Sequence, residues 1–99
     1  MNKTNIIQIL KEEKSFYKTQ FHVDKLGLFG SFAKDEQTED SDVDVLFELD
    51  DTPISDLYDN KEAFRNYLED KFQRKVDMCR IKFIKPFLKE YILKDAIFI

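Results

Sequence analysis

The chain has 99 residues and a formal net charge of −4, with 42% hydrophobic and 36% charged residues. This length predicts a single domain, residues 1–99, with a modest hydrophobic core. The negative charge argues against a long nucleic acid as the main partner, because holding phosphates usually requires a basic surface. A single cysteine excludes an intramolecular disulfide, and a single cysteine with a single histidine argue against a zinc site.

The sequence also predicts a cytoplasmic protein. No apolar run approaches the ~20 residues that span a bilayer. Residues 1–20 lack the hydrophobic region of a signal peptide.

A helix and a strand are predicted at the start of the chain. Apolar residues recur at helical spacing over residues 5–19, and Asn5 with Gln8 is a candidate capping box. Val23–Phe29 is predicted as the first strand. Gly27 interrupts it, which indicates the close approach of either a ligand, a neighbouring backbone or an aromatic side chain.

Gly30 and Ser31 end this strand, and Phe32–Glu36 has helix-forming character. Glycine at such a junction permits backbone conformations that other residues resist. The first N–H groups of a helix lack partners within the helix and attract phosphate, and the Ser31 hydroxyl adds another donor. Most such pairs, taken alone, are only a turn and a helix cap.

The second predicted strand, Asp42–Leu49, follows a polar loop and carries two acids at its start. Alternate residues of a strand share a face, so Asp42 and Asp44 point to one side and the apolar residues to the other. This pattern indicates a cation site. A calcium-binding loop is excluded, because Val45 stands where glycine is required and Asp51 where glutamate is required. A solvated and chemically idle acidic loop remains the alternative, and composition alone favours it.

The remaining pattern predicts a helix, a strand, a helix and a short apolar end. The second long helix covers residues 56–72, with Ser55 or Asp56 as its cap. The third strand is Lys75–Ile81, in which Asp77 shares a face with Cys79; the cysteine is interpreted as a small core residue. The final segments are a helix that starts at Pro86 and the tail Ala96–Ile99, which is either a last strand or a surface for a partner. This order predicts an α+β fold with a small mixed sheet and helices packed on it.

Three carboxylates, those of Asp42, Asp44 and Asp77, lie at strand positions that could converge at one edge of the sheet. Clustered carboxylates repel each other unless a cation compensates, and oxygen ligands suit Mg²⁺ or Mn²⁺. Two such ions beside a phosphate site would support in-line displacement at phosphorus. In that scheme Asp42 and Asp44 bind both metal ions, whereas Asp77 binds one of them and accepts a proton. The basic residues from Arg74 to Lys85 are interpreted mostly as a solvated rim.

A resemblance to a known family supports this chemistry. Gly30-Ser31, ten further residues and then Asp42-Val43-Asp44 match the Gly-Ser-x10-Asp-x-Asp signature of the minimal nucleotidyltransferases in the DNA polymerase β superfamily. The segment around Asp77 resembles the strand that carries the third carboxylate in this family, and the chain from Lys85 to Ile97 is also similar. Asp35 departs from the pattern, because many relatives have glycine at that position after the basic residue.

The resemblance implies a polymerase-β-like fold and Mg²⁺-dependent transfer of a nucleoside monophosphate, with ATP as the expected donor, to a hydroxyl group. It assigns Asp42, Asp44 and Asp77 as catalytic residues and metal ligands, and Gly30, Ser31 and Lys34 as nucleotide-binding residues. Proteins of this size resemble antitoxins that attach AMP to a tyrosine of a partner HEPN-type toxin. A protein hydroxyl or a small molecule is the expected acceptor, because the chain has no room for a nucleic-acid-binding domain.

Two alternatives from other classes remain. One is a catalytically idle module that neutralises its partner by occlusion, and the other is an enzyme that modifies a small molecule such as an antibiotic. The ten phenylalanines, four tyrosines and the apolar C-terminal tail also indicate a surface for a hetero-complex or an oligomer.

Overall fold

A computed structural model describes residues 1–99 and confirms the predicted α+β class. The helices are α1 (Lys3–Phe21), α2 (Gly30–Ala33), α3 (Leu57–Phe72) and α4 (Pro86–Lys94), with a 3₁₀ turn, η1 (Ile81–Phe83). The strands are β1 (Val23–Phe29), β2 (Val43–Leu49), β3 (Val76–Arg80) and β4 (Ile97–Phe98). None of the helices combines the length and the apolar character needed to cross a membrane.

The four strands form one mixed sheet in the order β3-β2-β1-β4. β1 is antiparallel to both β2 and β4, whereas β2 and β3 are parallel. A parallel pair requires a crossover connection, and α3 supplies it. The tail is therefore a strand, which resolves the alternative that the sequence left open.

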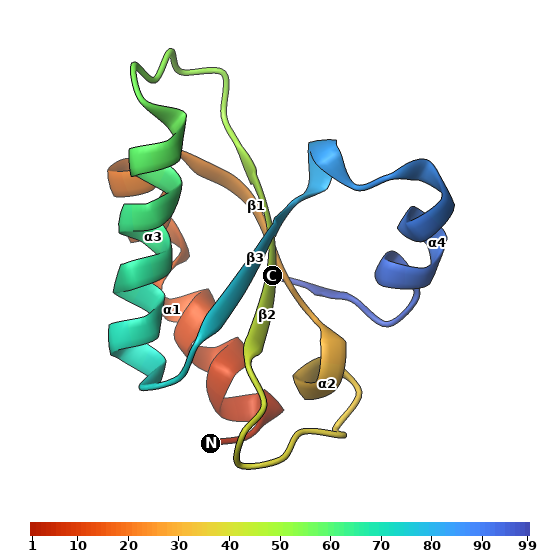
Figure 1. The fold of residues 1–99 in the computed structure, drawn as a ribbon. Coiled ribbons are helices and arrows are strands. Elements are labelled where there is room, and N and C mark those ends of the chain that lie inside the picture. The colour runs from red at the N-terminus through yellow and green to blue at the C-terminus, as the bar shows by residue number, and fades with distance from the viewer.

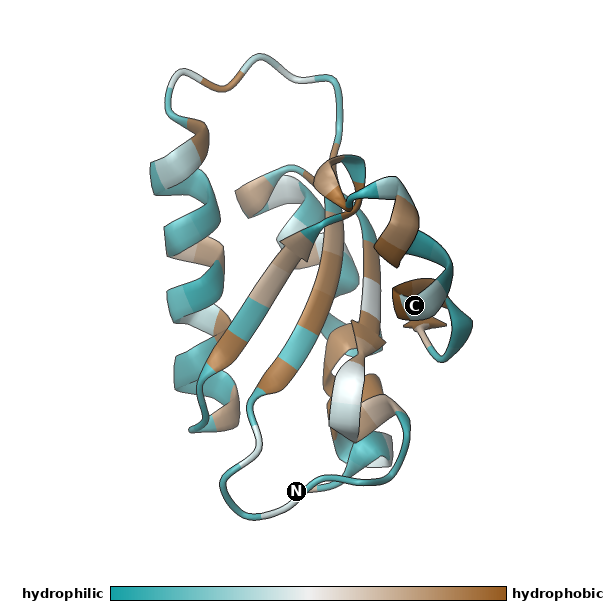
Figure 2. Ribbon diagram, turned by 45° about the vertical axis from the view of Figure 1, so that its right-hand side comes forward, coloured by the Kyte–Doolittle hydropathy of each residue, from teal (hydrophilic) through white to brown (hydrophobic).

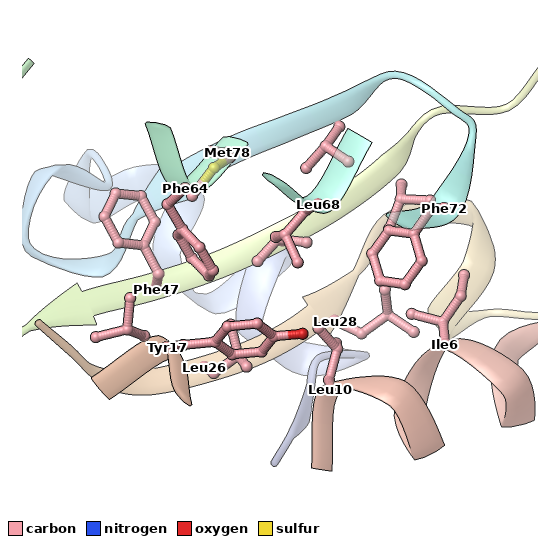
Figure 3. Packing of buried hydrophobic residues seen from close by; sticks show 14 of the residues in the cluster. Ile6, Leu10, Tyr17, Leu26, Leu28, Phe47, Phe64, Leu68, Phe72 and Met78 are labelled. Atoms are coloured by element: carbon pink, nitrogen blue, oxygen red, sulfur yellow. The ribbon is translucent and has the colours of Figure 1, made fainter. Parts of the chain in front are cut away.

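Helices α1 and α3 lie together on one side of the sheet, and α4 lies on the other side (Figure 1). A cluster of 17 buried hydrophobic residues fills the space between α1, α3 and the sheet. Figure 3 shows Leu10 and Tyr17 of α1 and Phe64 and Leu68 of α3 pointing toward the strands. The faces of β2 and β3 that enter this core carry Val43, Val45, Phe47, Val76 and Met78, all at most 8% exposed.

The ends of α1 differ from those predicted. Its capping box joins Asn2 and Asn5, each side chain accepting the backbone N–H of the other, rather than Asn5 and Gln8. The helix consequently begins at Lys3, two residues before the predicted start. At its other end it continues to Phe21, and His22 closes it in the left-handed conformation with φ 61°.

The short helix after β1 also differs from the prediction. It covers Gly30–Ala33 rather than Phe32–Glu36, because the positive φ of Gly30, 72°, lets the chain turn directly out of the strand. Glu36 lies beyond the helix end and its N–H donates to the Ser31 carbonyl oxygen.

The helices and strands predicted for the second half of the chain are confirmed, with small shifts of their ends. Asp56 caps α3 by accepting the N–H of Asp59, and Pro86 occupies the first turn of α4. β3 ends at Arg80, one residue before the predicted end, because the chain enters η1 at Ile81.

The sheet face opposite the main core is also partly covered. Leu46 lies on this face by strand alternation and is fully buried, which the sequence did not predict. Phe98 of β4 covers Gly27, since a Cβ at that glycine would lie 3.2 Å from Phe98 Cδ1. Because the Ile97 carbonyl oxygen would lie 3.3 Å from the same Cβ, the close approach that Gly27 indicated is that of both an aromatic side chain and a neighbouring backbone.

Candidate active site

The parallel pairing of β2 with β3 brings two of the predicted carboxylates side by side. In this register Asp44 is the partner of Asp77, between the pairs Val43–Val76 and Val45–Met78. Because these flanking pairs point into the main core, Asp44 and Asp77 point to the opposite face, toward the side of α4. Asp42, two residues before Asp44, lies just before β2, which begins at Val43 rather than at Asp42 as predicted.

The electrostatics of Asp44 reflect this arrangement. Burial raises its pKa first, and repulsion from Asp77 and then Asp42 raises it further, to about 6. None of the eight ion pairs of the chain includes Asp42, Asp44 or Asp77. The fold thus places three acids near each other and supplies no ion pair to balance them.

Gly30 fits so closely against Asp44 that a side chain at position 30 would displace the Asp44 carboxylate. A Cβ at Gly30 would overlap the Asp44 carboxylate, and its distance to Asp44 Cγ would be 2.8 Å. Together with the positive φ of this residue, 72°, the overlap makes glycine necessary on two separate grounds. The first turn of α2, with Gly30 and the half-buried Ser31, therefore lies directly beside the acids.

The donor chemistry of this face suits a hard divalent cation. Carboxylate oxygens are the ligands that Mg²⁺ prefers, and a cation would relieve the repulsion that raises the pKa of Asp44. The side chains do not converge into a group of three ligands as they stand. Mutual repulsion opposes that convergence when no cation is bound.

Lys34 contacts the end of α4 and makes no ion pair with the acids of the site. Its Nζ atom lies 4.0 Å from Asp95 Oδ2 and 5.4 Å from the centre of the Tyr91 ring. The side chain thus links the end of α2 to α4. Its predicted contact with the nucleotide phosphates would require this side chain to leave α4.

Asp35 makes a left-handed turn, a conformation that glycine adopts readily. Its φ is 58°, in the left-handed region that aspartate tolerates better than most residues, and its carboxylate pairs with Lys3 Nζ at 2.9 Å. The departure from the family pattern therefore leaves the turn in place.

Arg74 and Arg80 belong to the basic segment interpreted mostly as a solvated rim. Both make specific contacts instead, so the interpretation is wrong for these two residues. Arg80 Nε donates to Glu48 Oε2 at 2.8 Å, and Arg74 binds carbonyl oxygens of the loop that precedes β2. Their partners are more than thirty residues away along the chain, so no local pattern could have identified them. Cys79, predicted to be a small core residue, is only partly buried and lies outside the core cluster. Burial and the nearby Asp77 raise the pKa of its thiol, which makes it a poor nucleophile.

Acids on two adjacent parallel strands lie beside a helix that begins with glycine. This combination is typical of enzymes that transfer nucleotidyl groups. Residues 5–99 match the nucleotidyltransferase domain family, and the chain belongs to that family. The family expected from the sequence is thereby confirmed.

Curated relatives of similar length have related names. A Methanocaldococcus jannaschii protein with the provisional name protein adenylyltransferase MJ1379 is 35% identical over 97 residues, which cover 97% of this chain and 96% of the relative. Protein adenylyltransferase MntA of Thermococcus cleftensis is 29% identical over 94 residues, 95% of this chain and 92% of that protein.

Solved structures support the fold. A protein provisionally described as a minimal nucleotidyltransferase has a TM-score of 0.78 at 24% identity, over 98% of this chain and 95% of that one. The complex of a tri-AMPylated Shewanella oneidensis HEPN toxin with its MNT antitoxin matches with a TM-score of 0.57 at 16% identity, over 98% of this chain and 67% of that one. The expected nucleotidyltransferase fold is confirmed by these matches.

Proposed function

We propose that this protein transfers AMP from ATP to a tyrosine hydroxyl of a partner HEPN-type toxin and so acts as an antitoxin. The observation that carries the proposal is the pairing of Asp44 with Asp77 on adjacent parallel strands, beside Gly30. The names of the relatives, protein adenylyltransferase, support the reaction. The fold shared with an antitoxin bound to an AMPylated HEPN toxin supports the partner.

In the proposed reaction, the acceptor oxygen forms a bond to the α-phosphorus of ATP while the bond from that phosphorus to the bridging oxygen breaks, and pyrophosphate leaves. Gly30 and Ser31 orient the triphosphate through N–H and hydroxyl donors. Asp77 accepts the proton of the acceptor hydroxyl and releases it to solvent.

Asp42 and Asp44 would hold Mg²⁺, with Asp77 as a further ligand, and Mn²⁺ suits the same oxygen donors. When bound, two such ions would neutralise phosphate charge and stabilise the attacking and leaving oxygens. The chain itself contributes carboxylate oxygens as metal ligands, and no ion pair of the fold relieves their mutual repulsion.

The open shape of this face favours a large acceptor. One cavity, of about 230 Å³, is lined by residues that include Phe47, Leu57 and Phe83, and the other lies along α1; neither includes Asp42 or Asp44. A small molecule would need an enclosed pocket to hold it at the acids. A protein side chain can instead be positioned by contacts elsewhere on its surface.

Exposed aromatic residues on the side of the sheet that the paired acids of β2 and β3 face offer such contacts. No residue of α4 is buried, and Phe87 and Tyr91 are 77% and 69% exposed. Figure 2 shows hydrophobic segments along α4, on the side of the sheet that the carboxylates face. Phe98, 50% exposed, lies over Gly27 on the same side of the sheet. An exposed apolar patch of this kind is typical of a protein interface, and we assign it to the toxin.

The test is transfer of label from α-labelled ATP, with Mg²⁺, to the protein encoded by the adjacent gene, where that gene encodes a HEPN-type protein. Wild type should label the partner, Asp42→Asn and Asp44→Asn should not, and Asp51→Asn should behave as wild type because it removes an exposed acid outside the site. Absence of labelling by wild type, with a HEPN-type protein as the substrate, would contradict the proposal.

The exposed surface of α4 also favours a second candidate, a module that neutralises the partner by occlusion alone. The two candidate functions predict different results for one variant. If occlusion suffices, Asp44→Asn should still neutralise the toxin fully in a growth assay; if AMP transfer is required, it should fail.

A further inference from the structure

Arg74 connects the loop before β2 to the segment between α3 and β3. Its Nη1 atom donates to the carbonyl oxygens of Glu39 and Ser41, both at 3.0 Å, and more weakly to that of Thr38 at 3.4 Å. The side chain is half-buried and takes part in no ion pair. All its hydrogen bonds therefore go to backbone carbonyl groups.

The loop that Arg74 binds is a small closed turn that ends at Asp42. The Thr38 N–H donates to Ser41 Oγ at 2.8 Å, and the Ser41 N–H donates to the Thr38 carbonyl oxygen at 3.2 Å. Three carbonyl oxygens of this turn thereby face one guanidinium group. All three contacts are made by Nη1, whose two N–H groups serve the two nearer oxygens, so the longer contact to Thr38 is a shared one.

The same arginine also contacts the phosphate side of the site. Its guanidinium carbon lies 5.2 Å from the centre of the Phe32 ring, and Phe32 is a fully buried residue of α2. Phe32 follows Gly30 and Ser31 in the same four-residue helix. Next to Arg74, the Lys75 carbonyl oxygen accepts the N–H of Val43 at 2.9 Å, one residue after Asp42.

We propose that Arg74 is a positioning residue that holds Asp42 and the start of α2 in register with Asp77. It lies three residues before Asp77, contacts the turn that leads into Asp42 and packs over α2, so one side chain links the three segments of the site. The catalytic consequence rests on the proposed function; the structural consequence does not.

The test uses Arg74→Met, which keeps an apolar stem over Phe32 and removes the donors, and Arg74→Lys, which keeps the charge. Lys71→Met is the matched control, because it removes a positive charge near the same end of α3 but contacts Glu13 of α1, at 3.2 Å. The readouts are amide hydrogen exchange over residues 38–43, Mn²⁺ binding by calorimetry, and kcat with the Mg²⁺ concentration for half-maximal activity.

Residues that orient metal ligands typically change metal affinity or activity by about 10- to 100-fold when replaced. Arg74→Met should therefore weaken Mn²⁺ binding at least about tenfold and speed exchange in residues 38–43. Arg74→Lys should be intermediate and Lys71→Met within about twofold of wild type. Excess Mg²⁺ should restore part of the activity of folded Arg74→Met, as expected when the affinity of a metal site is reduced.

Unchanged Mn²⁺ binding and loop exchange in folded Arg74→Met would overturn the proposal, and so would equal losses in Lys71→Met. If Arg74→Met does not fold, Arg74→Lys decides by the same measurements. If wild type transfers no AMP, the proposed function fails, whereas Mn²⁺ binding and exchange still decide the role of Arg74.

Discussion

Replacing Asp44 with asparagine should stabilise the protein while removing its activity. Burial, Asp77 and Asp42 raise the pKa of Asp44 to about 6, so the folded state disfavours the ionised carboxylate at neutral pH. A rise from the ordinary value near 4 corresponds to about 3 kcal/mol. Solvent screening of this half-buried group reduces the effect to roughly 1 kcal/mol. For about 100 residues this amounts to a rise in Tm of about 4 °C.

The pH dependence follows from the sign of the shift. Below about pH 4, Asp44 is protonated in both the folded and the unfolded states, so the carboxylate costs nothing. Between about pH 4 and pH 6 the unfolded chain releases the proton first, and the wild type loses stability relative to the variant. Above about pH 6 the difference is constant.

The assay is urea unfolding of wild type, Asp44→Asn and the exposed control Asp51→Asn across this pH range, in buffer free of divalent cations. Addition of millimolar Mg²⁺ should stabilise wild type more than Asp44→Asn, because a ligand stabilises the state that binds it. A variant less stable than wild type at neutral pH without Mg²⁺, or a difference that does not change with pH, would refute the reasoning.

Three further predictions concern the turn at Gly30, the aspartate at position 35 and the exposed surface of α4. Gly30→Ala should cost at least about 1–2 kcal/mol in urea unfolding and abolish transfer, because φ is 72° and the new Cβ meets the Asp44 carboxylate. In a Lys3→Met background, where the ion pair is absent, Asp35→Gly should stabilise by up to about 1 kcal/mol, because glycine accepts a φ of 58° without strain. Phe87→Ser should leave unfolding within about 0.5 kcal/mol of wild type, since the residue is 77% exposed, yet weaken toxin binding at least tenfold by calorimetry.

Each of these predictions has a contrary result. Full activity of Gly30→Ala would show that α2 can move away from Asp44 at little cost. Destabilisation of the Lys3→Met protein by Asp35→Gly would show that the left-handed turn is not strained. Unchanged toxin binding by Phe87→Ser, with Lys89→Ser as an exposed control on the same helix, would remove α4 from the interface.

Most of the secondary structure was accessible from local patterns. β1 has the predicted bounds, and β2 presents Val43, Val45 and Phe47 to the core as alternation requires. The features that were predicted wrongly are helix starts, where more than one nearby residue could serve as the cap or the first residue. Asn5 takes part in a capping box, but with Asn2 rather than Gln8, and α2 starts at Gly30 because its positive φ turns the chain earlier than helix propensity indicated.

The sequence by itself determined which chemistry is available: a glycine and serine after a strand, then Asp42 and Asp44 on one side of the next. Only the tertiary structure decided that Asp77 pairs with Asp44, that Gly30 lies against the Asp44 carboxylate, and that Arg74 binds the loop before Asp42. Periodicity reports which face a residue occupies within its own element. Contacts between residues more than thirty positions apart depend on strand order and register, which the packing of the whole core sets.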